Sequence, residues 1–214
     1  MKQKCILFDL DGTLTDSGLG IINCALATFL KYAIPLPDRA EMRTMVGPPL
    51  RQSFVRYGIA PELVDEAVAY YRSLYNDTGK YENVPYPGIT DLLKRLKADG
   101  HRLFVATSKP EHMSVDILQH FSMDHYFERI CGSLLDGVRD KKEAVIAYLL
   151  DGIGGADNAV MVGDTVYDVL GANVHNIPTV AVSWGYGNCD EMVDAGASAV
   201  VHTMDQLYDQ LTRE

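Results

Sequence analysis

An apolar run near the N-terminus, Cys5–Phe8, is followed directly by Asp9, Asp11 and Gly12. The run predicts a buried β-strand, and the glycine predicts that this strand ends in a tight turn. Because side chains alternate along a strand, the two aspartates lie on the same side of it. Two carboxylates so close together are unfavourable unless a cation binds them, and Mg²⁺ is a hard cation that prefers oxygen ligands. The alternative is an acidic, solvated turn, because short motifs also occur by chance.

From residue 85 onward the sequence alternates between helical and strand patterns. Further strands are predicted at residues 103–106, 129–132, 159–162, 179–182 and 199–201. Such alternation is typical of parallel strands with helices packed on both faces. The predicted fold class is therefore α/β, with a doubly wound parallel sheet. Ligands in these sheets bind beyond the carboxyl ends of the strands, which is where Asp9 and Asp11 are expected.

Residues 16–84 interrupt this alternation. Apolar side chains recur there at helical spacing, and the pattern contains no convincing strand. The segment 84–88, Val-Pro-Tyr-Pro-Gly, is stiff and rich in turn-forming residues, which predicts a return hinge. We therefore expect a helical domain over 16–84, inserted into a core domain that consists of 1–15 and 85–214.

Polar residues also stand at the end of one strand and at the start of one helix in the predicted core. Thr107 and Ser108 follow the strand 103–106, where a hydroxyl can hold a phosphate oxygen or can simply cap the next helix. Lys141 and Lys142 stand at a helix start, where a positive charge opposes the helix dipole. Such a lysine could neutralise a phosphate and a carboxylate, or belong to a solvated basic turn. Spacing to the apolar residues of the helix favours Lys142, with Lys141 as the alternate.

A second acidic pair follows the strand 159–162. Asp164 and Asp168 are one helical turn apart, which places them on the same face of a helix start. The alternative is that the pair only caps this helix. Because Asp9 is far away in the sequence, only folding could unite the two acidic motifs.

Taken together, these motifs resemble those of the haloacid dehalogenase superfamily of phosphatases. The matching patterns are D-x-D-G-T-L-x-D-S from Asp9, the strand-terminal Thr107, a lysine before a helix, and G-D-x-x-x-D-x-x-G-A from Gly163. The resemblance spans essentially the whole chain and is closest to the phosphoglycolate phosphatase-like branch. It implies a Rossmann-like core in which residues 16–84 form a cap over the site.

The resemblance also implies roles for individual residues. Asp9 would be the nucleophile and Asp11 the general acid/base, while Thr107 and Lys142 would complete the catalytic set. Substrate contacts would further come from the core residues Gly12 and Ser108 and from the cap residues Gly47 and Arg51. Mg²⁺ would be held by Asp9, Asp11 through its backbone carbonyl, Asp164 and Asp168.

The implied activity is Mg²⁺-dependent hydrolysis of a small phosphorylated metabolite through an aspartyl-phosphate, as in phosphoglycolate phosphatases. A phosphosugar mutase, a 5′-nucleotidase or a pyrophosphatase of the same superfamily are alternatives, because the cap decides the substrate. A phosphate-binding regulator is the alternative that is not an enzyme. The complete acidic set argues against a dehalogenase, which needs neither the second aspartate nor the metal.

Charge and composition limit the partners. The net charge of −10 argues against nucleic acid and anionic membranes, which require a basic surface. Four scattered cysteines fit a reducing compartment, and we find neither a secretory signal nor an apolar run long enough to span a membrane. We expect a cytoplasmic protein that is a monomer or a homodimer.

Overall fold

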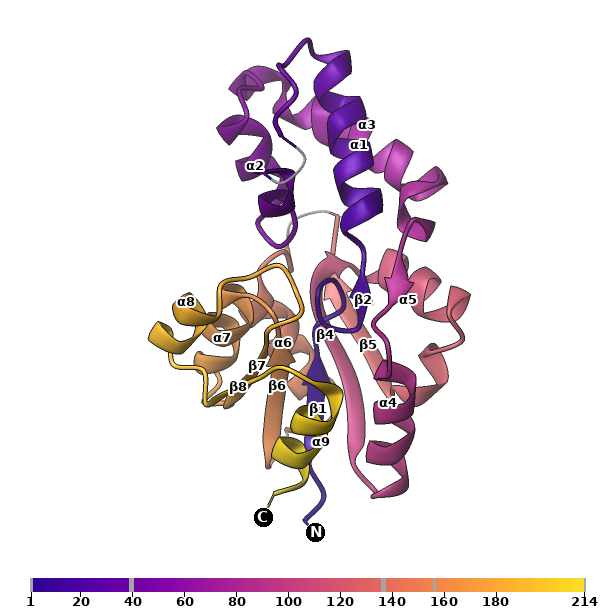
Figure 1. Cartoon of the computed structure of the whole chain (residues 1–214), viewed down its shortest axis with the longest axis vertical. Helices are drawn as coiled ribbons and strands as arrows, with labels where there is room; N and C mark the ends of the chain where they lie inside the picture. The colour runs from indigo at the N-terminus through magenta and orange to yellow at the C-terminus, as the bar shows by residue number, and fades with distance from the viewer. Residues whose placement is uncertain (1, 39–40, 136–137, 156, 214) are drawn as a thin grey trace. The chain divides into compact units, whose positions relative to one another are not determined.

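The computed structural model describes residues 2–38, 41–135, 138–155 and 157–213 (Figure 1). Contacts within the chain divide it into two compact units. The core unit comprises the residues up to Thr15 and those from Pro85 onward, and the helical unit is Asp16–Val84. The two connections between the units, β2 (Thr15–Asp16) and β3 (Val84–Pro85), pair as a small two-stranded sheet.

A six-stranded sheet with the order β5-β4-β1-β6-β7-β8 forms the centre of the core unit. All of its neighbouring strands pair in parallel. The strands are β1 (Cys5–Phe8), β4 (Arg102–Pro110), β5 (Arg129–Ser133), β6 (Ala159–Gly163), β7 (Thr179–Val182) and β8 (Ala199–Val201). The parallel arrangement agrees with the alternating pattern of the sequence.

Period-two alternation along β1 divides the apolar core into two layers. Ile6 and Phe8 pack on one face with residues of α4, α5 and α9, whereas Cys5 and Leu7 pack on the other with residues of α6 and α7. Met192 of α8 packs with Val169 of α7. These helices are α4 (Ile89–Ala98), α5 (Glu111–His120), α6 (Lys142–Gly152), α7 (Val166–Asn173), α8 (Cys189–Asp194) and α9 (Met204–Thr212). Helices cover both faces of the sheet, so the predicted α/β fold class is confirmed.

The central position of β1 determines where a site can form. The chain adds β4 and β5 on one side of β1, and then adds β6, β7 and β8 on the other. The strand order therefore reverses at β1, and doubly wound sheets bind their ligands beyond the carboxyl ends of the strands at such a point. Asp9 follows β1 directly, and Asp164 follows the neighbouring β6.

The helical unit packs around aromatic side chains. It consists of α1 (Gly18–Lys31), α2 (Leu50–Arg56) and α3 (Val64–Asp77), with short 3₁₀ helices at Glu41–Met45, Pro61–Leu63 and Gly79–Tyr81. Phe54 meets Phe29 edge-on at a centroid distance of 5.8 Å and Tyr71 at 5.9 Å. In the part of the chain that the structure describes, no helix has both the length and the apolar character that a membrane span requires.

Candidate active site

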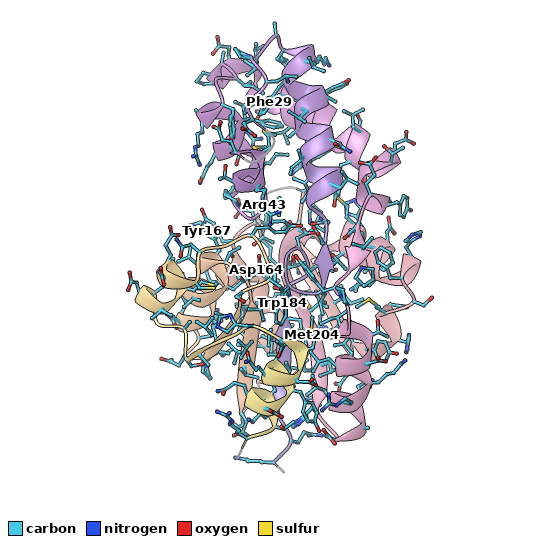
Figure 2. All side chains as sticks on the ribbon, in the orientation of Figure 1. Phe29, Arg43, Asp164, Tyr167, Trp184 and Met204 are labelled. Atoms are coloured by element: carbon cyan, nitrogen blue, oxygen red, sulfur yellow. The ribbon has the colours of Figure 1, made fainter. Side chains whose placement is uncertain are left out.

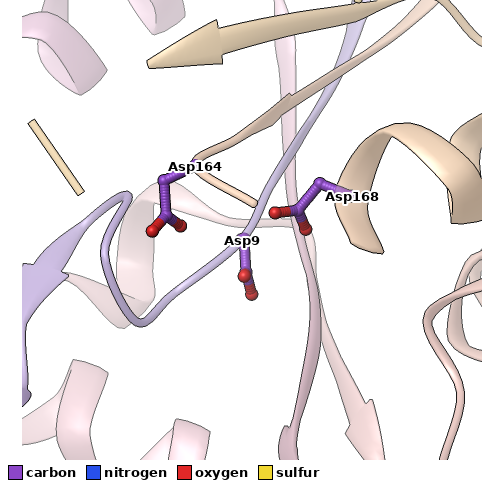
Figure 3. A group of neighbouring side chains, drawn as sticks. All are labelled: Asp9, Asp164 and Asp168. Carbon is purple, nitrogen blue, oxygen red and sulfur yellow. The ribbon is translucent and has the colours of Figure 1, made fainter. Parts of the chain in front are cut away.

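Three buried carboxylates meet at the carboxyl edge of the sheet. Asp9 follows β1, Asp164 follows β6, and Asp168 lies in the first turn of α7 (Figure 3). Each side chain offers one oxygen, and these oxygens lie within 4.8 Å of one another. Two acidic motifs that are remote in the sequence therefore form a single group.

Lys142, the first residue of α6, supplies a cation to this group. Its Nζ lies 2.8 Å from an oxygen of Asp9 and 2.8 Å from an oxygen of Asp168, and it donates to the carbonyl of Ala106. Its side chain is 3% exposed, whereas that of Lys141 is 75% exposed and lies near Glu143. The structure thus brings Lys142, and not the alternate Lys141, to the aspartates.

Burial dominates the acid–base properties of the cluster. It raises the pKa of Asp9, against the opposing effect of the Lys142 ammonium. It also raises the pKa of Asp164 well above its usual range, and the charges of Asp168 and Asp9 add to this shift. Burial alone would lower the pKa of Lys142, but the carboxylates of Asp168 and Asp9 outweigh burial, so this pKa is raised. A further cation would favour the ionised forms of the carboxylates.

Two loops close around Asp164. The Thr13 hydroxyl donates to one carboxylate oxygen at 3.0 Å, and the backbone N–H of Tyr186 donates to the other at 2.9 Å. Gly12 has a φ of +83°, and a Cβ at either Gly12 or Gly185 would overlap the Asp164 carboxylate. The loop after β7 was absent from our sequence interpretation, although its Trp-Gly-Tyr-Gly sequence is a signal for a close backbone approach.

Asp168 has two structural tasks. One of its oxygens accepts hydrogen bonds from the backbone N–H and the hydroxyl of Thr165, which forms a capping box at the start of α7. The other oxygen faces Lys142 at 2.8 Å. The capping alternative considered from the sequence is therefore realised, together with proximity to the acidic cluster.

Residues 107–109 leave the regular ladder between β4 and β5. The register of this pair shifts between Ala106 and Pro110. Thr107 is buried and its hydroxyl donates to the Asp9 carboxylate, whereas Ser108 is exposed. Of the two predicted phosphate contacts, the structure brings only Thr107 to the aspartates.

Asp11 contacts a different lysine. Both of its carboxylate oxygens accept from the Nζ of Lys109, at 2.9 Å and 2.7 Å. The Lys109 side chain is 5% exposed. Our sequence interpretation did not include Lys109, although it follows Thr107 by only two positions. The two aspartates of the D-x-D motif are thus paired with separate lysines.

Comparison with known proteins identifies the family of this chain. The sequence matches the family of haloacid dehalogenase-like hydrolases over residues 6–182. The chain belongs to this family. It is 43% identical to a 5′-nucleotidase of Pseudomonas aeruginosa over 90% of the chain and 88% of the relative, and 33% identical to a phosphoglycolate phosphatase of Caulobacter vibrioides over 95% and 88%. The crystal structure of a predicted phosphatase from Clostridium acetobutylicum matches with a TM-score of 0.93 and 41% identity, covering 99% of both chains.

Membership of the haloacid dehalogenase family gives the class of activity. The protein is a phosphatase of this family, a phosphoric monoester hydrolase with an α/β core. Its buried acidic group fits the divalent metal that phosphatases of the family generally use.

The cap residues predicted from the sequence lie in the helical unit of this haloacid dehalogenase-family phosphatase. Gly47 is exposed and precedes α2. Arg51 is exposed in α2, and its guanidinium pairs with Asp65 of α3. Their roles toward substrate stay predictions.

Proposed function

We propose that this phosphatase is Mg²⁺-dependent and hydrolyses a small phosphorylated metabolite through an aspartyl-phosphate on Asp9. The observation that supports the proposal is the separation of the two aspartates. Asp9 lies in the buried cluster beside Lys142, whereas Asp11 lies outside it and is bound by Lys109. This separation supports different roles for the two carboxylates, attack by Asp9 and proton transfer by Asp11.

The donor set fits Mg²⁺. The charged side chains of the site are Asp9, Asp11, Asp164, Asp168, Lys109 and Lys142. When all of them are ionised, the four carboxylates and two ammonium groups have a formal charge of two minus. A divalent cation would neutralise this charge. The donors in the cluster are carboxylate oxygens, which suit a hard cation. Asp9, Asp164 and the carbonyl of Asp11 would hold the ion, with Asp168 in support. When bound, Mg²⁺ would offset the negative charge of the phosphoryl oxygens.

The side chains then divide the reaction into two displacements. A carboxylate oxygen of Asp9 attacks phosphorus, the bond from phosphorus to the ester oxygen breaks, and Asp11 gives its proton to the departing oxygen. Water next attacks the phosphorus of the aspartyl-phosphate and gives a proton to Asp11, while the bond to Asp9 breaks and releases phosphate. Thr107 and Lys142 bind the phosphoryl oxygens, where negative charge has to be stabilised.

The metal proposal predicts a strict requirement for a divalent ion. Chelation should abolish activity and Mg²⁺ should restore it. Asp164→Asn should raise the Mg²⁺ concentration for half-maximal activity by at least about tenfold, because a hard anionic ligand is lost. Trp184, the chain's only tryptophan, donates to the carbonyl of Thr13, whose hydroxyl binds Asp164. Figure 2 labels Trp184 and Asp164, and the fluorescence of this tryptophan gives a second titration.

The exposed Asp151 of α6 provides a matched control. Asp151→Asn should titrate like the wild type by both readouts. Full activity after exhaustive chelation would exclude a metal-dependent mechanism. An unchanged titration of Asp164→Asn would remove this residue from the metal site.

For the substrate we propose phosphoglycolate. A 5′-nucleoside monophosphate is the second candidate, since the relative that is 43% identical carries the name of a 5′-nucleotidase. The test measures kcat/KM for both compounds at the same Mg²⁺ concentration, with phosphoglycolate expected to be the better substrate. Arg51→Ala should lower kcat/KM for the preferred substrate while p-nitrophenyl phosphate is hydrolysed as before. A clear preference for the nucleotide would reassign the substrate.

A further inference from the structure

Lys109 reaches the site because β4 is irregular at its end. The β4–β5 register shifts after Ala106, and the backbone N–H of Lys109 donates to the Thr107 hydroxyl at 3.3 Å. Ser108 between them is exposed, whereas the side chain of Lys109 is buried. The local turn therefore directs two side chains of this segment inward, one to each aspartate of the D-x-D motif.

The contact of Lys109 with Asp11 constrains the carboxylate. One ammonium binds both oxygens at 2.9 Å and 2.7 Å, while the Asp11 side chain is 18% exposed. Exposed ion pairs contribute little because water screens them and the side chains remain mobile. A lysine that is 5% exposed has lost most of this freedom, and its charge-assisted contact to both oxygens restricts how the Asp11 carboxylate can turn.

The two aspartates are paired with different lysines. Lys142 lies 2.8 Å from Asp9 and 2.8 Å from Asp168, so both of its ion pairs lie within the buried acidic cluster. Lys109 binds the carboxylate of Asp11, two residues beyond Asp9.

We propose that Lys109 is a positioning residue, which holds the Asp11 carboxylate in the orientation for proton exchange with the leaving oxygen and with water. This inference rests on the proposed acid/base role of Asp11. A lysine that bound the phosphate itself would act on every substrate. A lysine that positions Asp11 acts only where a proton is needed. The nature of the leaving group therefore distinguishes the two roles.

The experiment compares kcat/KM for an alkyl phosphate and for p-nitrophenyl phosphate at saturating Mg²⁺. An alkoxide needs a proton to depart, whereas p-nitrophenolate does not. Lys109→Met should lower kcat/KM for the alkyl ester by about 10- to 100-fold, because a misplaced catalytic group loses this much, and for the nitrophenyl ester by less than about threefold. Lys109→Arg should recover most of the loss, since it restores a cation.

Three comparisons complete the design. Asp11→Asn alone should show the same selectivity for the alkyl ester, with a loss of about 100- to 10,000-fold. Adding Lys109→Met to Asp11→Asn should cause no further loss, because both changes remove the same proton transfer. Lys97→Met, a change of an exposed lysine in α4, should behave like the wild type on both esters.

The outcomes separate this inference from the proposed function. One outcome is that Asp11→Asn loses kcat/KM mainly on the alkyl ester, while Lys109→Met loses the same factor on both esters. Another is that the double variant loses the product of the two single losses. Either outcome overturns the positioning role of Lys109 and leaves the role of Asp11 standing. If Asp11→Asn itself lowers both esters equally, both proposals fail. Should Lys109→Met melt below the assay temperature, Lys109→Gln and Lys109→Arg provide the same comparison.

Discussion

Replacement of Asp9 by asparagine should abolish turnover and prevent formation of any covalent intermediate. Asparagine keeps the shape of the side chain but cannot supply the attacking carboxylate oxygen. We expect kcat to fall by on the order of 10⁴-fold or more, as is usual when a nucleophile is removed. The measurement is intact mass after rapid acid quench, in which the wild type should gain the mass of one phosphoryl group and Asp9→Asn should not.

The matched variant for this experiment is Asp11→Asn. Its nucleophile is intact, but the water that cleaves the intermediate has lost its base. The phosphorylated form of this variant should therefore accumulate when p-nitrophenyl phosphate is the substrate. Detection of the same adduct on Asp9→Asn would show that another residue attacks phosphorus.

Replacement of Lys142 by methionine should impair both catalysis and folding. The buried ammonium lies 2.8 Å from Asp9 and 2.8 Å from Asp168, so its loss leaves two buried carboxylates without their cation. Removal of one partner from such a buried pair costs about 3–5 kcal/mol of unfolding free energy. We expect a loss in kcat of about 100- to 1,000-fold as well, because an electrostatic contact to the phosphoryl group disappears. Urea unfolding and steady-state kinetics measure the two effects.

The pH dependence of the stability loss in Lys142→Met follows from the direction in which the pKa of Lys142 is shifted. The carboxylates raise the folded-state pKa of Lys142 above its ordinary value. While its carboxylate partners are ionised, the stabilisation by this lysine is complete below the ordinary lysine pKa, and it is lost as the pH rises through the raised pKa. The difference in unfolding free energy between the wild type and Lys142→Met should persist between about pH 6 and pH 9.

Lys141→Met is the control for this change. Its side chain is exposed beside Glu143, so the variant should keep the stability and activity of the wild type. The reverse result, with Lys141→Met inactive and Lys142→Met unaffected, would make Lys141 the lysine of the site.

Local sequence patterns were sufficient to predict those site residues that lie at the end of a strand or at the start of a helix. Asp9 follows one apolar strand and Asp164 follows another, so continuous apolar runs located both strand ends. The α/β fold class followed from the alternation of these runs with helices. The choice of Lys142 over Lys141 also had a local cause, since its position relative to the apolar face of α6 favoured it.

Other parts of the site depend on irregular backbone or distant partners. The predicted strand 103–106 gave no reason to expect a buried Lys109 side chain. The register shift that turns this side chain inward depends on the pairing of β4 with β5. The loop after β7 has no periodicity, yet the N–H of Tyr186 completes the environment of Asp164. Asp168 shows a third case, since one short motif serves both as a helix cap and as a partner of Lys142.

The central place of β1 has a consequence for the order in which the chain can fold. This strand leaves the ribosome before both of its partners, since Cys5 pairs with Arg102 on one side and with Ala159 on the other. Contacts at such separations close long loops, which slows folding. The helical unit, Asp16–Val84, is contiguous and is synthesised before either partner of β1. During synthesis β1 therefore stays without either of its sheet partners until Arg102 and later Ala159 have been made, whereas the helical unit already has all of its residues.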